Sequence, residues 1–145
     1  MTAELSDWDR ALVTELLGRA ALPGPVRDAR DMGFGLGAVG LAYPLIMWLT
    51  IGDAAGLTAA TQYLFGVPLG LIALRFTRHS SRVRTAALAA ALAQGAMGVL
   101  SGTGPVPFPL WVVASLYSLV TSCAILYQLN RSEAMAWFDQ PRLAH

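Results

Sequence analysis

Long apolar stretches without charged residues separate the ten arginines of this chain into three clusters. A stretch of about 20 apolar residues forms a helix long enough to cross the roughly 30 Å hydrocarbon core of a bilayer. The chain has 55% hydrophobic and only 13% charged residues, against about 25% charged residues in soluble domains. Both features indicate an integral membrane protein. The three clusters are Arg10, Arg19, Arg27 and Arg30; Arg75, Arg78, Arg82 and Arg84; and Arg131 and Arg142.

Four apolar stretches can be delimited, and they predict an all-α, integral membrane four-helix bundle. Pro44 and Pro68 interrupt the first two, and we expect a kink at each. The last two come from one run, Thr85 to Asn130, which contains no Asp, Glu, Lys, Arg or His and is broken by glycines and prolines. The expected spans are 33–52, 54–74, 85–101 and 108–129, within a membrane domain 33–129 flanked by tails 1–32 and 130–145.

The arginines also predict the orientation of the spans. Loops rich in Lys and Arg stay on the cytoplasmic side, and with four spans all ten arginines share one face. We therefore expect both termini in the cytoplasm. Arginine without lysine, beside abundant Ala and Gly, is typical of a GC-rich bacterial genome, so the expected location is a bacterial inner membrane. In a three-span alternative, residues 85–101 would lie on the membrane surface and Arg131 and Arg142 would be outside.

The amino-terminal segment has the pattern of an amphipathic helix. Trp8, Leu12 and Leu16 repeat on one face at four-residue intervals. This face is suited to docking on another subunit or, alternatively, to lying in the lipid interface. Residues 23–25 (Pro-Gly-Pro) are expected to end this helix and to form a linker to the first span. The segment lacks the basic start and short apolar core of a secretory signal.

Small residues on two spans predict close helix packing. The first span carries a glycine face and the third a similar alanine and glycine ridge, and we expect both to contact neighbouring helices, including those of a partner. Gly35, Gly37 and Gly40 also match the dinucleotide pattern GxGxxG, but no strand precedes them, so that site is excluded. The residues concerned are Gly33, Gly37 and Gly40 in the first span and Ala87, Ala91, Gly95 and Gly98 in the third.

Polar side chains within the spans are few. Gln62 and Gln94 supply amides, and Ser115, Ser118 and Ser122 form a hydroxyl stripe on the fourth span. We expect interhelical hydrogen bonds from them, with a polar pathway as the alternative. No carboxylate or histidine lies inside a span, which argues against a proton-coupled pump. In size and number of spans the chain resembles the small multidrug-resistance transporters, but it has no counterpart of that family's membrane-embedded glutamate.

The sequence predicts no catalytic, metal or cofactor site. His79 is expected to be a solvated residue of the arginine-rich loop, and His145 is the last residue, so neither is placed to ligate haem. Cys123 is the only cysteine, which excludes an intramolecular disulfide, and we expect it in the core. The arginines follow the ends of the apolar stretches instead of forming one soluble basic face, so no nucleic-acid partner is expected.

Two cytoplasmic segments are candidate contact surfaces. Residues 75–84 form a basic hairpin suited to anionic phospholipids or to an acidic patch on a partner, through Arg75, Arg78, Arg82 and Arg84. Residues 132–138 are expected to form a short interfacial helix with Met135, Trp137 and Phe138 towards the membrane.

The function expected from these features is not enzymatic. We expect an accessory, structural or assembly subunit that packs against other integral membrane subunits of a larger complex. The alternative is a small homo-oligomeric transporter or channel, in which kinked spans and Gln62 or Gln94 surround a pathway.

Overall fold

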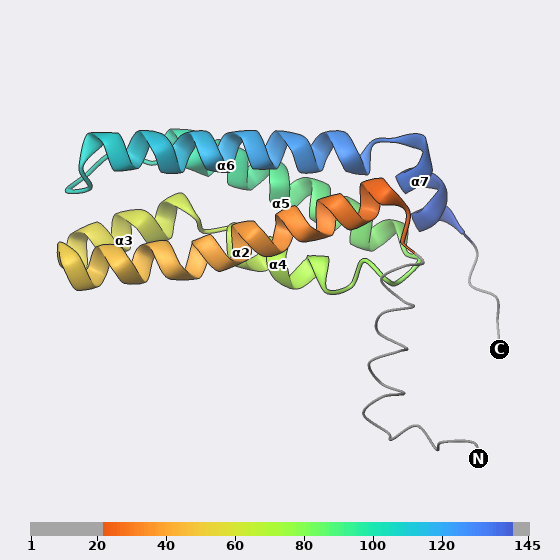
Figure 1. Ribbon diagram of the computed structural model, residues 1–145, viewed down its shortest axis with the longest axis horizontal. Helices are drawn as coiled ribbons and strands as arrows, with labels where there is room; N and C mark the ends of the chain where they lie inside the picture. Colours follow the sequence, from red (N-terminus) through yellow and green to blue (C-terminus); the bar gives the residue numbers. More distant parts are fainter. Residues whose placement is uncertain (1–21, 141–145) are drawn as a thin grey trace, which may run out of the picture.

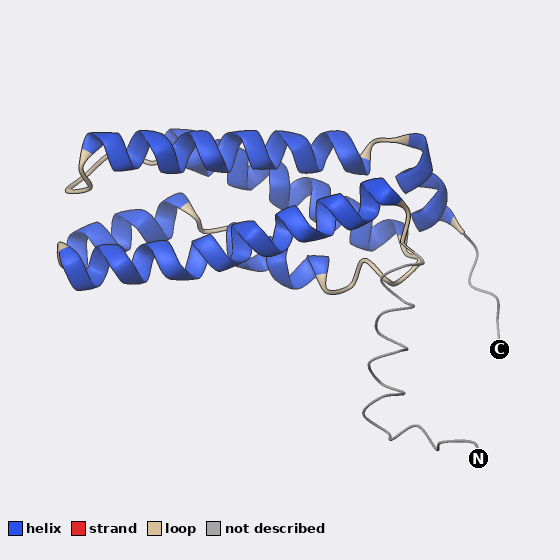
Figure 2. Ribbon diagram, in the orientation of Figure 1, coloured by secondary structure: helices blue, strands red, loops and turns tan. Residues whose placement is uncertain are grey.

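The computed structural model describes residues 22–140, and within them it contains helices and no strands (Figures 1 and 2). The expected helix around Trp8, Leu12 and Leu16 lies outside the described residues. The described helices are α2 (Gly24–Thr50), α3 (Asp53–Gln62), α4 (Gly66–Ala73), α5 (Ser81–Leu100), α6 (Phe108–Leu129) and α7 (Ser132–Asp139).

The helices form four arms that run side by side in alternating directions (Figure 1). The arms are α2, the pair α3 and α4, α5, and α6; α2 packs mainly on α4, and α5 mainly on α6. The start of α2, the loop 74–80 and helix α7 meet at one end of the bundle, which we name the arginine end. The turns 51–52 and 101–107 form the opposite, distal end.

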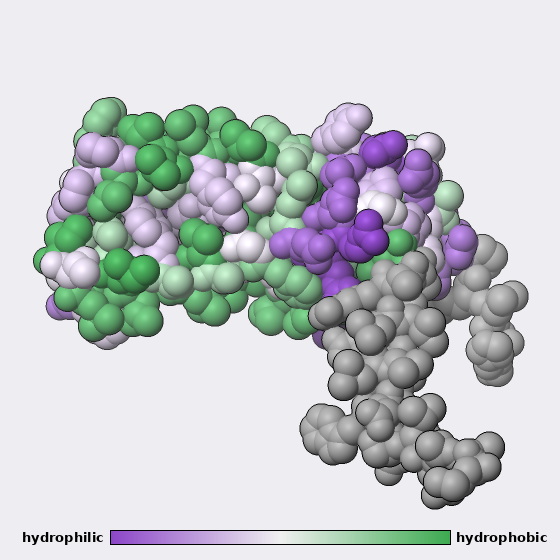
Figure 3. Space-filling view, in the orientation of Figure 1, coloured by the Kyte–Doolittle hydropathy of each residue, from purple (hydrophilic) through white to green (hydrophobic). Residues whose placement is uncertain are grey.

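Three helices, α2, α5 and α6, are long and apolar enough to cross a membrane. The bent pair α3 and α4 is a fourth candidate when it is counted as one span. Large apolar side chains remain exposed along the arms, such as Leu49, Leu92 and Val120. In Figure 3, hydrophobic residues are spread along the arms among residues of intermediate hydropathy, and the most hydrophilic residues gather at the arginine end. These features are those of a membrane protein with transmembrane helices, because a water-soluble bundle would cover so much apolar surface.

Helix α2 begins at Gly24 and not at Gly33, where the apolar stretch starts. The expected linker 23–25 is therefore the beginning of a helix. Proline is well tolerated at the first helical positions, because an N–H there has no intrahelical acceptor and the proline φ is already helical. Pro44 lies inside α2 without ending it.

The second arm is two helices and not one. Helices α3 and α4 are bent by 49° across residues 63–65. The kink expected at Pro68 lies before that residue, and Pro68 occupies the first turn of α4, where its missing N–H costs no hydrogen bond. At the break the chain also approaches α2 closely, since a Cβ added to Gly66 would lie 2.9 Å from the carbonyl oxygen of Leu36.

The glycine face of α2 packs against α4 of the same chain. A Cβ added to Gly37 would lie 3.3 Å from the Cα of Gly70, and one added to Gly33 would lie 3.1 Å from the Cβ of Ala73. Gly40 is placed in the same way against Tyr63 and the first turn of α4. This close backbone approach is the geometry that small residues allow in membrane helices.

The small-residue ridge of α5 packs against α6 of the same chain. A Cβ added to Gly95 would lie 3.2 Å from the Cβ of Ser122, and one added to Gly98 would lie 2.6 Å from the Oγ of Ser118. Ala87 and Ala91, on the same face, are fully buried. Both ridges thus contact helices of this chain, and they are not free for a partner.

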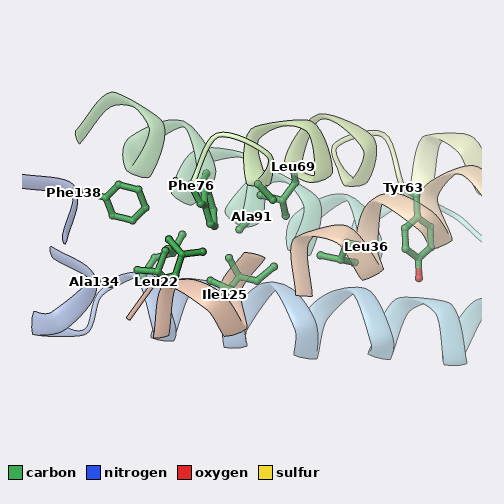
Figure 4. Packing of buried hydrophobic residues seen from close by; sticks show 14 of the residues in the cluster. Leu22, Leu36, Tyr63, Leu69, Phe76, Ala91, Ile125, Ala134 and Phe138 are labelled. Carbon is green, nitrogen blue, oxygen red and sulfur yellow. The ribbon is translucent and has the colours of Figure 1, made fainter. Parts of the chain in front are cut away.

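Larger apolar side chains fill the space between the arms. Leu36 from α2, Leu69 from α4 and Ile125 from α6 are fully buried (Figure 4). The same cluster continues to the arginine end, where Phe76 and Phe138 meet. One apolar core therefore runs from the middle of the bundle to the loop 74–80 and α7.

Candidate functional site

The polar side chains of the spans gather in the interior of the bundle. Gln62, at the end of α3, and Gln94, in the middle of α5, are both 0% exposed. They face Ser115, Ser118 and Ser122, whose spacing places them on one side of α6. All three serines are also buried. The structure therefore brings together every residue that the sequence analysis named for a polar interior.

Gln94 closes the break between α3 and α4. Its Nε2 donates to the backbone oxygen of Gln62, at 3.0 Å, and to the Oγ of Ser118, at 2.9 Å. Its Oε1 accepts the backbone N–H of Phe65, at 3.0 Å. One amide thus supplies an acceptor and two donors. The bonds to the Gln62 carbonyl oxygen and to the Phe65 N–H replace hydrogen bonds that a continuous helix would have made through its own backbone.

Gln62 is bonded less completely. Its Nε2 donates to the Oγ of Ser115, at 2.8 Å, and makes a long contact of 3.4 Å to the carbonyl oxygen of Trp111. Its Oε1 and the Oγ of Ser122 have no hydrogen-bond partner within residues 22–140. The two glutamines are equally buried, but only Gln94 has both ends of its amide bonded.

Tyr63 adds a further bond at the break, which the sequence analysis did not anticipate. Its hydroxyl donates to the carbonyl oxygen of Ala114, at 2.8 Å. The ring packs edge-on against Tyr43, with centroids 5.6 Å apart. Tyr63 directly follows Gln62 in the sequence, and this was the one available clue. An aromatic residue in an apolar stretch does not reveal its hydrogen-bond partner.

At the arginine end, Arg84 bonds to the end of α6. Its Nε donates to the carbonyl oxygen of Leu129, at 2.9 Å, and its Nη2 to the Oδ1 of Asn130, at 3.1 Å. A cation at this position satisfies a terminal carbonyl and complements the negative end of the helix dipole. Arg75, Arg78 and Arg82 remain exposed. Of the four arginines in the hairpin, Arg84 therefore has a contact within the chain and the other three face outwards.

Helix α7 is held against the loop 74–80. The Phe76 and Phe138 rings meet edge-on, with centroids 5.7 Å apart, and Phe138 is 2% exposed. Trp137 Nε1 donates to the carbonyl oxygen of Phe76, at 3.1 Å. His79 Nδ1 donates in turn to the carbonyl oxygen of Trp137, at 2.8 Å, and the two rings lie 4.1 Å apart. We name this group the α7 clasp.

The α7 clasp corrects two expectations. Phe138 is buried against the chain itself and Trp137 is half-buried there, whereas both were expected to point outwards like Met135, which is exposed. His79 is not a freely solvated loop residue, because it is half-buried and bonded to α7. The reason is that a short amphipathic helix buries its apolar side on any nearby apolar surface, and Phe76 supplies one.

The described residues contain no cluster of three or more His, Cys, Asp or Glu side chains that could hold a metal ion. Cys123 is exposed on α6 and not in the core, contrary to expectation. The neighbouring Ser122 is turned towards α5 and takes the buried position.

Comparisons with protein-family models, with curated proteins and with solved structures gave no match.

Proposed function

We propose that this protein is a non-catalytic accessory or assembly subunit of a bacterial inner-membrane complex, crossing the membrane four times with both termini in the cytoplasm. The observation that carries the proposal is the use of the interior polar groups. Gln94 uses its amide to bond the chain's own helix break, and no Asp, Glu, Lys, Arg or His lies within residues 33–52, 54–74, 85–101 or 108–129. The proposed activity therefore lies in the contacts that the surfaces of the bundle make with partner subunits.

The four-span topology is supported by length and by charge. The 18 helical residues of α3 and α4 cover about 27 Å, close to the thickness of the hydrocarbon core. The described arginines all belong to segments at the arginine end, whereas Asp53 is the one charged residue near the distal turns. The positive-inside rule then places the arginine end in the cytoplasm.

Topology is tested by cysteine labelling in intact cells. After Cys123→Ser, single cysteines at Arg78 and at Thr103 report on the two ends of the bundle. We expect a membrane-impermeant maleimide to label position 103 from outside and position 78 only after the cells are opened. Labelling of position 78 from outside would contradict the proposal.

The arginine end is the proposed partner surface. The α7 clasp holds the loop 74–80 in place and leaves Arg75, Arg78 and Arg82 exposed. Such a surface suits an acidic patch of a partner or anionic headgroups, at about 1 kcal/mol for each basic residue near an anionic membrane. The apolar faces of the arms would contact other integral subunits.

The accessory function is tested by complex size. The protein is extracted from its native membrane in mild detergent, and we expect it to run as part of a larger assembly. The triple variant R75E/R78E/R82E should release it, whereas the matched control Arg131→Glu, an exposed arginine of the same end, should not. A monodisperse monomer from native membranes would contradict the proposal.

The transporter alternative has less support. A pathway needs polar groups that are free to meet a substrate, but Gln94 is bonded at both ends of its amide, and among the five polar side chains of the interior only Gln62 Oε1 and Ser122 Oγ lack a partner within the described residues. Flux into proteoliposomes that is lost in Gln62→Leu, with the fold retained, would revive this alternative.

A further inference from the structure

An apolar groove lies between α2 and α3 near the distal end of the bundle. Its volume is about 510 Å³, and its lining comes from both helices, including Pro44, Leu45 and Trp48 of α2 and Leu57 of α3. Leu45 and Leu57 are well exposed, so the groove faces the surroundings of the bundle and not its core. In a membrane this means that the groove opens sideways into lipid.

Small residues of α3 give the groove its shape. A Cβ added to Gly56 would lie 2.7 Å from the Cβ of Trp48, so α3 and α2 could not approach as closely with any other residue there. Ala60, one turn further along α3, also lines the groove. Because Gly56 and Ala60 have little or no side chain, a hollow remains between the larger side chains of the two helices.

A single carboxylate lines the same groove. Asp53 is the first residue of α3 and the only Asp, Glu, Lys, Arg or His between Asp31 and Arg75. It accepts a hydrogen bond from Trp48 Nε1. The described arginines belong to segments at the opposite end of the bundle, so within residues 22–140 this carboxylate has no basic neighbour.

We propose that the groove binds a lipophilic monocation. Its positive group lies against the Asp53 carboxylate and the Trp48 ring, and its apolar part fills the hollow beside Leu45 and Leu57. The assignment rests on charge complementarity, because a negative group at the rim of an apolar groove attracts a cation more strongly than it would in water. Tryptophan is also the side chain that interacts best with an organic cation.

The charges around the groove favour a cation that carries no phosphate over a phospholipid. A zwitterionic phospholipid would bring a phosphate with its amine, and the described residues near Asp53 include no arginine to bind it. A monocation leaves no such group unpaired. This site is separate from the arginine end, and the proposal does not depend on the accessory function.

The test uses the full-length protein in dodecyl maltoside, an uncharged detergent. Tetraphenylphosphonium is the cationic probe, and tetraphenylborate has nearly the same size and shape with the opposite charge. Equilibrium dialysis measures binding to the protein after subtraction of binding to empty micelles. We expect saturable binding of the phosphonium, at one per chain, and at least tenfold weaker binding of the borate.

Three variants separate the contribution of the Asp53 charge to binding from that of the hollow. Asp53→Asn keeps the shape and removes the one negative charge of the groove, and we expect roughly tenfold weaker phosphonium binding. Ala60→Leu fills the hollow and should reduce binding similarly, with Asp53 in place. The control Asp31→Asn removes an exposed carboxylate at the arginine end and should leave binding unchanged. An unaltered elution volume shows that each variant is folded.

Each opposite outcome overturns the proposal. Equal phosphonium binding by Asp53→Asn and by the wild type would mean that the carboxylate has no part in it. If added phosphatidylethanolamine displaces the phosphonium, the occupant is a lipid amine. If the wild type is a dimer that Ala60→Leu converts to a monomer, a second copy covers the groove.

Discussion

Gln94→Leu should be the most damaging conservative change in the interior of the bundle. Leucine has nearly the volume of glutamine, so the substitution removes the amide without opening a large cavity. It takes away the acceptor of the Phe65 N–H and the donor to the Gln62 carbonyl oxygen. Ser118 loses one of its two contacts with residue 94 but keeps the other, to the backbone oxygen, at 3.2 Å.

The magnitude follows from these losses. An interhelical hydrogen bond in a membrane protein contributes about 0.6 kcal/mol, and a buried polar group left without a partner costs about 1–3 kcal/mol. The two unpartnered backbone groups and the lost bond to Ser118 together give an expected loss of about 3–7 kcal/mol in the free energy of unfolding. The cost concentrates at one residue because the helix break has no backbone alternative for these two groups.

Gln62→Leu is the matched control, because Gln62 is just as deeply buried. This change removes one good bond, to Ser115, and one long contact. It also removes an Oε1 that has no partner in the described structure. The gain and the loss nearly cancel, so we expect the free energy of unfolding to change by less than about 1 kcal/mol.

The assay is equilibrium unfolding in mixed micelles of increasing sodium dodecyl sulfate content, followed by far-ultraviolet circular dichroism. The double variant Gln94→Leu/Ser118→Ala should cost less than the sum of the two single changes, because the residues share a bond. If Gln94→Leu is no more destabilising than Gln62→Leu, the idea that Gln94 closes the break is refuted.

Other contacts give further predictions. Gly37→Leu should prevent close packing on α4 and cost several kcal/mol in the same assay, whereas Gly102→Leu should be nearly neutral, since a Cβ at Gly102 meets nothing within 4 Å. Phe138→Ala should release α7 and speed its proteolysis at least tenfold, with Met135→Ala as the exposed control; equal rates would argue against the α7 clasp. Arg84→Ala should lower the free energy of unfolding by about 1 kcal/mol, because the end of α6 loses a hydrogen bond and a favourable charge. Substitutions of the exposed arginines should lower it less.

The helices of this protein were largely predictable from the sequence. The fourth predicted span, 108–129, coincides with α6, and the third differs from α5 mainly at its start. Apolar length and charge-free composition are local properties, and they are enough to place a membrane helix. The exceptions occur at prolines, where the position of Pro25 or Pro68 within a turn decides whether a helix begins or breaks.

The partners of the interior residues were not predictable in the same way. A row of glycines such as Gly33, Gly37 and Gly40 has the same pattern whether it faces α4 or a second protein. Gln62 and Gln94 have the same residue type and similar surroundings in the sequence, yet one is fully bonded and the other is not. Such differences depend on residues far away along the chain.

The sequence by itself determined that the chain is a helical membrane protein with its arginines grouped between apolar stretches, because hydropathy and charge act locally. Only the tertiary structure decided that the small-residue faces meet within the chain, that Gln94 closes a helix break and that α7 folds onto the loop 74–80. The physical reason is that close packing and hydrogen bonding depend on positions within a few tenths of an ångström. Contacts between distant segments set those positions.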